Sequence, residues 1–220
     1  MKKSDYVITS VFVSTFLWFS INAIHPWIGW IYLNILISGG LLVWAALRWD
    51  APRYIREGAM LGFGSAFIYL IVNGLFVRVA LILDYLRKDV LIFHTPLSVI
   101  LTWGLMITLG IYLYRRIREF IGNFYLPALV IGILAFVVTF GLNELGNIGR
   151  LWNWNMLRVP RPILNSTPFY VPLANFLVPF AAPYILGGNP VIEIFRCGVT
   201  ISVLQLLCFM IFRTLFLSPL

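Results

Sequence analysis

Long apolar runs, separated by short polar segments, set the pattern of this sequence. Within a run, apolar residues follow one another for about 20 residues and do not alternate with polar ones, which is typical of a membrane-spanning helix and not of a barrel strand. A segment inside a bilayer must make its backbone hydrogen bonds internally, and a helix does so. The pattern therefore predicts an all-α fold, a polytopic bundle of transmembrane helices.

Seven of these runs are long enough to be membrane spans. They cover Tyr6–Ile24, Trp27–Leu47, Gly58–Leu83, Leu91–Tyr114, Phe124–Leu145, Pro168–Leu186 and Pro190–Phe216. The connections between them are short, and none has the composition of a linker between domains. We therefore expect about seven spans, with residues 1–220 forming a single integral membrane domain.

The composition excludes an ordinary soluble domain. Hydrophobic residues make up 61% of the chain and charged residues only 11%, whereas a soluble domain has about 25% charged residues. The formal net charge is +8, which in a soluble protein would suggest nucleic-acid binding. Here the basic residues lie at the ends of apolar runs, where they contact anionic lipid. We expect membrane lipid as a partner and no nucleic acid.

The distribution of basic residues also predicts an orientation in the cell membrane. With a cytoplasmic N-terminus, the inner segments hold Lys2, Lys3, Arg48, Arg53, Arg56, Arg115, Arg116, Arg118 and Arg196, and the outer segments hold Arg87, Lys88, Arg150, Arg158 and Arg161. This bias favours a multi-pass protein with its N-terminus inside. The same topology brings chemically varied side chains to the outer face, namely His25, Asp84, Asp89, His94, Glu144, Trp152 and Trp154. A functional site is expected at that face.

Glu144, at the outer end of the fifth span, is the first candidate for chemistry. An acidic residue at membrane depth is costly and is therefore a functional hypothesis by default. In an apolar pocket it would stay protonated and could act as an acid. The alternatives are a solvated position at the helix end or an ion pair with Arg78. Asp84 and His94, on either side of the preceding outer loop, would complete a polar cluster with Glu144.

Two tryptophans, Trp152 and Trp154, lie two residues apart in the longest non-spanning stretch. They would form one wall of an apolar pocket or belong to the aromatic belt that membrane proteins place at the lipid–water interface. The chain has only two histidines, His25 and His94, and no spacing typical of a metal site. We expect neither a metal nor another cofactor.

Motifs within about residues 70–180 carry a family likeness. Thr95-Pro-Leu-Ser-Val-Ile-Leu-Thr-Trp103 is followed by Glu144-Leu-Gly-Asn-Ile-Gly149 with Trp152-Asn-Trp154, and then by Val171-Pro-Leu-Ala-Asn-Phe176. In order and approximate spacing, these motifs resemble those of the carotenoid-biosynthesis integral membrane protein family, which includes bisanhydrobacterioruberin hydratase. The chain departs from the family by having Leu145 in place of Pro, Val178-Pro179 in place of Gly-Trp, and Asn73-Gly74 near a family acidic residue.

The resemblance implies an isoprenoid- or carotenoid-modifying enzyme that hydrates or cyclises a carbon–carbon double bond by acid-initiated addition. A carboxylic acid, Glu144 or Asp84, would protonate the alkene without a cofactor. Aromatic faces attract cations and would stabilise the tertiary cation, and Asn175 would orient water or the hydrophobic isoprenoid-like substrate. The implied substrate-binding residues are Trp103, Trp152, Trp154, Asn175, His94 and Arg78.

Two other functional classes compete with an enzyme. The first is a non-enzymatic structural or accessory subunit of a membrane complex, with a protein partner or as a homo-oligomer. It is favoured by the scarcity of carboxylates within the spans, since proton chemistry needs them. The second is a transporter, which is disfavoured because the sequence has neither a pair of broken helices nor an inverted repeat.

Overall fold

The structure is a computed structural model, and it describes residues 2–49, 53–87 and 89–216, so Lys88 lies outside the described residues. Six helices are long and apolar enough to cross a membrane. They are α1 (Lys3–Ile24), α2 (Gly29–Arg48), α3 (Tyr54–Arg78), α4 (Leu97–Ile121), α5 (Tyr125–Ile148) and α8 (Pro190–Phe216). The predicted all-α transmembrane bundle is confirmed.

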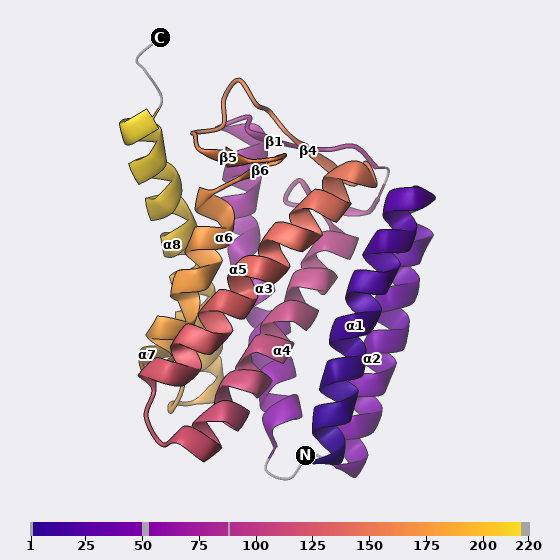
Figure 1. Cartoon of the computed structure of the whole chain (residues 1–220), viewed down its shortest axis with the longest axis vertical. Coiled ribbons are helices and arrows are strands. Elements are labelled where there is room, and N and C mark those ends of the chain that lie inside the picture. Colours follow the sequence, from indigo (N-terminus) through magenta and orange to yellow (C-terminus); the bar gives the residue numbers. More distant parts are fainter. Residues whose placement is uncertain (1, 50–52, 88, 217–220) are drawn as a thin grey trace.

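The predicted sixth span, Pro168–Leu186, is shorter and interrupted. It consists of α6 (Tyr170–Leu177), the 3-10 turn η1 (Val178–Ala181) and α7 (Ala182–Ile185). Pro179 has no N–H to donate to the carbonyl of Asn175, and its ring clashes with that carbonyl in a regular helix. Figure 1 shows α1 starting at one end of the bundle and α8 finishing at the other. The interrupted segment is therefore a seventh passage through the bundle.

Short strands in the two longest connections correct two predicted boundaries. The predicted spans Gly58–Leu83 and Leu91–Tyr114 extend into these connections, whereas α3 ends at Arg78 and α4 begins at Leu97. The strands are β1 (Leu83–Tyr85), β2 (Leu91–Ile92), β3 (Thr95–Pro96), β4 (Trp152–Trp154), β5 (Ile163–Leu164) and β6 (Thr167–Pro168). Hydropathy extended the spans because the α3–α4 connection is rich in apolar residues; Leu83 among them is buried, whereas Val79 and Leu91 are exposed.

The strands gather at one end of the bundle (Figure 1), which we name the strand end and define as residues 79–87, 89–96 and 149–169. β1 pairs antiparallel with β4, and the register sets Asp84 opposite Asn153. The prediction that Asp84, Trp152 and Trp154 share one face of the protein is therefore confirmed. The pairing also joins the α3–α4 connection to the α5–α6 connection.

Helices α3 and α4 pack closely through glycines. A Cβ atom at Gly62 would lie 2.4 Å from Thr108 Oγ1 and 2.5 Å from the Gly104 carbonyl oxygen, and one at Gly58 would lie 3.1 Å from the Thr108 carbonyl. Small residues at such positions let membrane helices approach each other. The Gly58-xxx-Gly62 spacing is thus a helix–helix contact.

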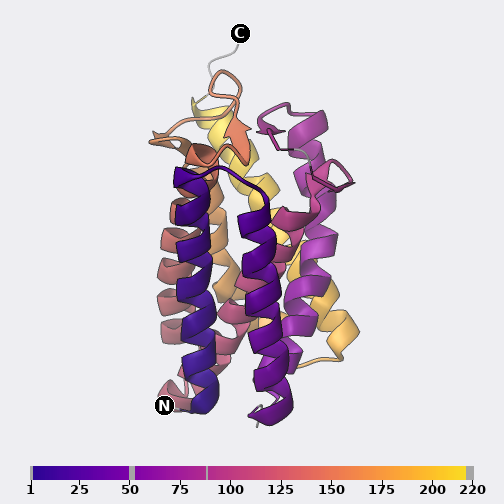
Figure 2. The same ribbon diagram turned by 90° about the vertical axis from the view of Figure 1, so that its right-hand side faces the viewer.

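Helices α1 and α2 form a pair on one flank of the bundle (Figure 2). Buried polar side chains connect them: Ser38 Oγ donates to Asn34 Oδ1 at 3.0 Å, and Asn34 Nδ2 donates to Thr15 Oγ1 at 3.3 Å. All three residues are fully buried. Hydrogen bonds of this kind hold membrane helices together where the hydrophobic effect between helices is weak.

Ion pairs fasten the opposite end of the bundle, which we name the arginine end after Arg115 and Arg116. Arg116 Nε lies 3.1 Å from Asp5 Oδ1 and so joins α4 to α1. Arg115 pairs with Glu57 of α3, and its Nη2 lies 3.8 Å from Glu193 Oε2 of α8. The two arginines therefore connect four helices at this end.

Candidate functional site

A cavity of about 190 Å³ lies within the bundle and is lined by residues of α1 to α5, the α6–α7 segment and α8. Its lining extends from Trp152 and Leu83 at the strand end to Tyr114 and Leu186 toward the arginine end. Along α4 alone it reaches from Ser98 to Tyr114, which at 1.5 Å per residue is about 24 Å. The cavity is therefore long and narrow and lies along the bundle axis.

The lining of this cavity is apolar, aromatic and uncharged. None of the described residues that line it is Asp, Glu, His, Lys or Arg, and each of them is buried or half-buried. Pockets for small molecules have this general character, with a few polar groups set among apolar side chains. The cavity therefore suits an elongated apolar molecule.

Four of the residues expected at the site line the cavity: Trp103, Trp152, Trp154 and Asn175. Trp152 and Trp154 alternate with the exposed Asn153 along β4, and successive residues of a strand point to opposite faces. Both indoles therefore face the bundle interior, where they are 9% and 5% exposed. This burial supports the pocket-wall interpretation over the interfacial belt.

Each of these two tryptophans has a specific contact on α5. A Cβ atom at Gly146 would lie 2.1 Å from Trp152 Cζ2, so the indole lies directly on the glycine. Trp154 Nε1 donates to Asn143 Oδ1 at 3.3 Å, and Asn143 Nδ2 donates to the Thr139 carbonyl at 2.8 Å. The tryptophan wall is thereby positioned by a regular helix.

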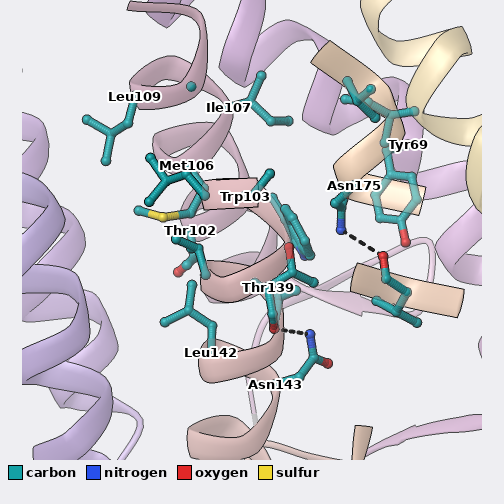
Figure 3. Close-up of a pocket in the computed structure, with 18 of the residues that line it drawn as sticks. Tyr69, Thr102, Trp103, Met106, Ile107, Leu109, Thr139, Leu142, Asn143 and Asn175 are labelled. Carbon is teal, nitrogen blue, oxygen red and sulfur yellow. Dashed lines mark hydrogen bonds between the residues drawn. The ribbon is translucent and has the colours of Figure 1, made fainter. Parts of the chain in front are cut away.

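Polar side chains from four different helices meet in one part of the cavity (Figure 3). We name Tyr69 of α3, Trp103 of α4, Thr139 of α5 and Asn175 of α6 the neutral cluster. The Tyr69 and Trp103 rings lie 6.2 Å apart, and Asn175 Nδ2 donates to the Val171 carbonyl at 3.2 Å. The Tyr69 hydroxyl, the Trp103 indole N–H and the Thr139 hydroxyl bond to no described residue.

Sequence reasoning identified Trp103 and Asn175 but missed Tyr69 and Thr139. No sequence signal singles these two out, because Ser, Thr and Tyr are common within the spans of this chain and in membrane helices generally. Which of several such residues face one another depends on the packing of the helices, and hydropathy does not contain that information.

Asn73 of α3 connects this helix to the strand end. Its Nδ2 donates to Tyr85 Oη at 2.8 Å and to Thr95 Oγ1 at 2.6 Å. Burial raises the pKa of the Tyr85 hydroxyl above its ordinary value, so this group stays protonated. Asn73 and Tyr85 both line the cavity, and they add neutral groups to the part of it nearest the strand end.

The structure places Glu144 outside the cavity lining. Its carboxylate accepts hydrogen bonds from the Ser166 backbone N–H at 3.1 Å, from Ser166 Oγ at 2.8 Å, and from the side chains of Asn165 and Thr167. These partners belong to the β5–β6 hairpin, so Glu144 fixes this hairpin on the end of α5. The expected alternatives of a solvated carboxylate or a pair with Arg78 are wrong, because the side chain is 9% exposed and bonded to the hairpin.

The predicted cluster of Asp84, His94 and Arg78 around Glu144 does not form. Asp84 is exposed on β1, while its neighbours Leu83 and Tyr85 line the cavity; strand alternation therefore directs Asp84 away from the cavity. Arg78 Nε lies 3.3 Å from both ring nitrogens of His94, and both residues are exposed. Neither Asp84 nor His94 is among the hydrogen-bond partners of Glu144.

Among the described residues, no group of three or more His, Cys, Asp or Glu side chains is arranged to hold a metal ion. Comparison with protein families, curated proteins and solved structures found no match. The resemblance to the carotenoid-biosynthesis family therefore stays a prediction, and function has to be inferred from the geometry and chemistry of the cavity.

Proposed function

We propose that this protein binds an elongated apolar molecule, of isoprenoid type, in its central cavity. The observation that carries the proposal is the shape and chemistry of that cavity, which is long, uncharged and lined by apolar and aromatic side chains. Burying apolar surface there is favourable by about 25 cal/mol per Å². An extended hydrocarbon chain buries the most apolar surface against such a lining and so gains the most binding free energy.

The position of the motifs supports an isoprenoid chain over other apolar molecules. Each motif that resembles the carotenoid-biosynthesis family contributes lining residues, although they are far apart in the sequence. Trp103 comes from the first motif, Trp152 and Trp154 from the second, and Val171 and Asn175 from the third. The likeness is therefore concentrated on one cavity.

The proposal is binding and not acid-initiated catalysis. Protonation of a double bond needs a carboxylic acid near the substrate, whereas the described lining has none and Glu144 and Asp84 lie outside it. The interrupted helix supports a binding role, because Val178 and Pro179 at its break line the cavity. Non-helical backbone at membrane depth is tolerated where it is buried or lines a cavity.

Two glycines provide a matched test. A Cβ atom at Gly110 or at Gly40 would have no atom within 4 Å, but Gly110 lines the cavity and Gly40 is exposed on α2. Gly110→Leu therefore fills the cavity, whereas Gly40→Leu adds the same side chain facing lipid. Both variants should fold, since leucine is a better helix former than glycine.

The measurement is retention of tritiated geranylgeraniol by the purified protein in phosphatidylcholine nanodiscs, with empty nanodiscs subtracted. The wild type and Gly40→Leu should retain about one equivalent per chain, and Gly110→Leu should retain less than a tenth of that, because the leucine occupies the space of the chain. Equal retention by the two variants would show that the molecule binds elsewhere. No retention by the wild type would favour an accessory subunit without this ligand.

A further inference from the structure

We infer that the molecule in the cavity carries an uncharged oxygen function, a hydroxyl or carbonyl group, and that this group binds at the neutral cluster of Tyr69, Trp103, Thr139 and Asn175. The inference rests on the proposed function, since it specifies the chemistry of the same ligand. It follows from three properties of the cluster: its depth, its hydrogen-bonding inventory and the absence of charge around it.

The cluster lies deep within the spans. Tyr69 precedes the end of α3 at Arg78 by nine residues, and Thr139 precedes the end of α5 at Ile148 by nine residues, which is about 13 Å along each helix. A polar group at this depth is costly unless it is hydrogen-bonded. Three groups of the cluster have no partner among the described residues. A ligand oxygen would supply the missing partner.

The cluster offers both donors and an acceptor. The Trp103 indole can only donate, the Tyr69 and Thr139 hydroxyls can donate or accept, and the Asn175 amide oxygen can accept. A hydroxyl group on the ligand can therefore both accept and donate, and a carbonyl group can accept more than one hydrogen bond. A pure hydrocarbon satisfies none of these groups.

The charge of the lining excludes anionic head groups. A carboxylate or diphosphate in this cavity would be removed from water without a cation beside it, because no described lining residue is Lys, Arg or His. Burial of an unpaired charge is far more costly than burial of a neutral oxygen. The geometry therefore points to an isoprenoid alcohol, aldehyde or ketone and not to a prenyl diphosphate or a fatty acid.

Competition against bound tritiated geranylgeraniol in nanodiscs tests this inference. The competitors are unlabelled geranylgeraniol, the hydrocarbon with the same chain but no hydroxyl group, and geranylgeranyl diphosphate. The hydrocarbon should compete about tenfold more weakly than the alcohol, which corresponds to the loss of one or two hydrogen bonds. The diphosphate should compete at least about a hundredfold more weakly, because its charge is unpaired.

Two tyrosines supply the matched variants. The hydroxyls of Tyr69 and Tyr170 both lack a partner among the described residues, so neither Tyr→Phe change breaks a described hydrogen bond. Tyr69 lines the cavity, whereas Tyr170 is fully buried and is not part of the lining. Tyr69→Phe should reduce the preference for the alcohol over the hydrocarbon about threefold to tenfold, and Tyr170→Phe, which removes a hydroxyl that interacts with Tyr69 from outside the lining, should reduce it clearly less.

Asn175→Leu gives a second measurement and should also reduce the preference for the alcohol while keeping the affinity for the hydrocarbon. If the alcohol and the hydrocarbon compete equally, or if the diphosphate competes as well as the alcohol, the inference is overturned. The proposed function still stands in those cases, provided that Gly110→Leu abolishes retention. If Gly110→Leu has no effect, the proposed function fails and the inference fails with it.

Discussion

The two ends of the bundle differ in how their polar side chains are paired. At the arginine end, charged side chains pair with one another: Arg116 with Asp5, and Arg115 with Glu57 and Glu193. Toward the strand end, the cavity is surrounded by neutral hydroxyl, indole and amide groups, several of which have no partner among the described residues.

We interpret the difference as one of role: the arginine end stabilises the fold, and the cavity toward the strand end binds a ligand. Paired charges fix the positions of four helices but leave no group free for a ligand. Neutral groups that lack partners stabilise the fold less, and they are available to a ligand. Glu144 and Asp89 are exceptions at the strand end. The Glu144 carboxylate is bonded to the β5–β6 hairpin, and the Asp89 carboxylate accepts hydrogen bonds from Tyr32 and Ser98, so both belong with the structural charges.

The first prediction concerns which end faces which side of the membrane, and its expected result is all-or-none. Loop charge predicts that the strand end is outside and the arginine end inside. A cysteine at position 153, in the exposed Asn153 site of β4, should react with an impermeant maleimide added to intact cells. A cysteine at position 117 should react only after the membrane is opened. The reverse labelling pattern would place the strand end inside and the arginine end outside.

The second prediction addresses Glu144 and distinguishes a structural carboxylate from a catalytic acid. Glu144→Gln leaves one acceptor oxygen for four donors, and its new NH₂ group faces them. The free energy of unfolding should fall by about 3 kcal/mol, since each unsatisfied buried group costs about 1–3 kcal/mol. Thermal unfolding in detergent measures this change.

The control for Glu144 is Glu119→Gln at the arginine end, where the side chain is 27% exposed. Exposed ion pairs contribute about 0–1 kcal/mol, so this variant should unfold near the wild-type temperature. A stable Glu144→Gln protein that has lost isoprenoid turnover would instead restore the acid interpretation.

The third prediction breaks the arginine end and leaves the cavity intact. Arg115→Gln removes the cation beside Glu193. The Glu193 side chain is buried, at 6% exposed, and its carboxylate also accepts hydrogen bonds from the backbone N–H groups of Gly187 and Gly188. The free energy of unfolding should fall by about 2 kcal/mol because a buried carboxylate loses its counterion. Geranylgeraniol retention at a temperature where the variant is folded should match the wild type. Lost retention would show that the two ends are coupled.

The smallest expected effect is that of pH on ligand retention. Between about pH 5.5 and 8.5, histidine is the side chain that normally titrates, and no described lining residue is His, Asp or Glu. Burial raises the pKa of the Tyr85 hydroxyl, so this group stays protonated over the whole interval. Retention should therefore be constant. A fall as pH rises through the interval would indicate a carboxylic acid or imidazolium in contact with the ligand.

The sequence predicted the six long helices well because crossing a bilayer requires a run of about 20 apolar residues. The boundaries near Leu83 and Leu91 were wrong because hydropathy does not distinguish the apolar residues of a loop, such as the cavity-lining Leu83 and the exposed Leu91, from those of a span. Pro179 within an apolar run marks the interruption of the sixth segment in the sequence. Hydropathy summed over that run does not detect the interruption, because it takes no account of the backbone N–H that proline lacks.

The site was only partly predictable, and the reason is the range of the contacts. The tryptophans of β4 were candidates because two indoles two residues apart could form one wall of a pocket, but the strand that directs both inward was not predicted. The role of Glu144 was not found because its partners, Asn165 to Thr167, follow it by more than 20 residues, in a loop whose fold the sequence pattern does not specify.

The contact between Gly146 and Trp152 has a consequence for the ancestry of this chain. An alanine at position 146 would place its methyl group inside the indole ring, and a ring system cannot move aside as a flexible side chain does. A lineage can therefore exchange the glycine only after the tryptophan has been replaced by a smaller residue. Distant homologues that keep this architecture and lack the glycine should therefore also lack the tryptophan, whereas the tryptophan alone can be replaced by a smaller residue while the glycine stays.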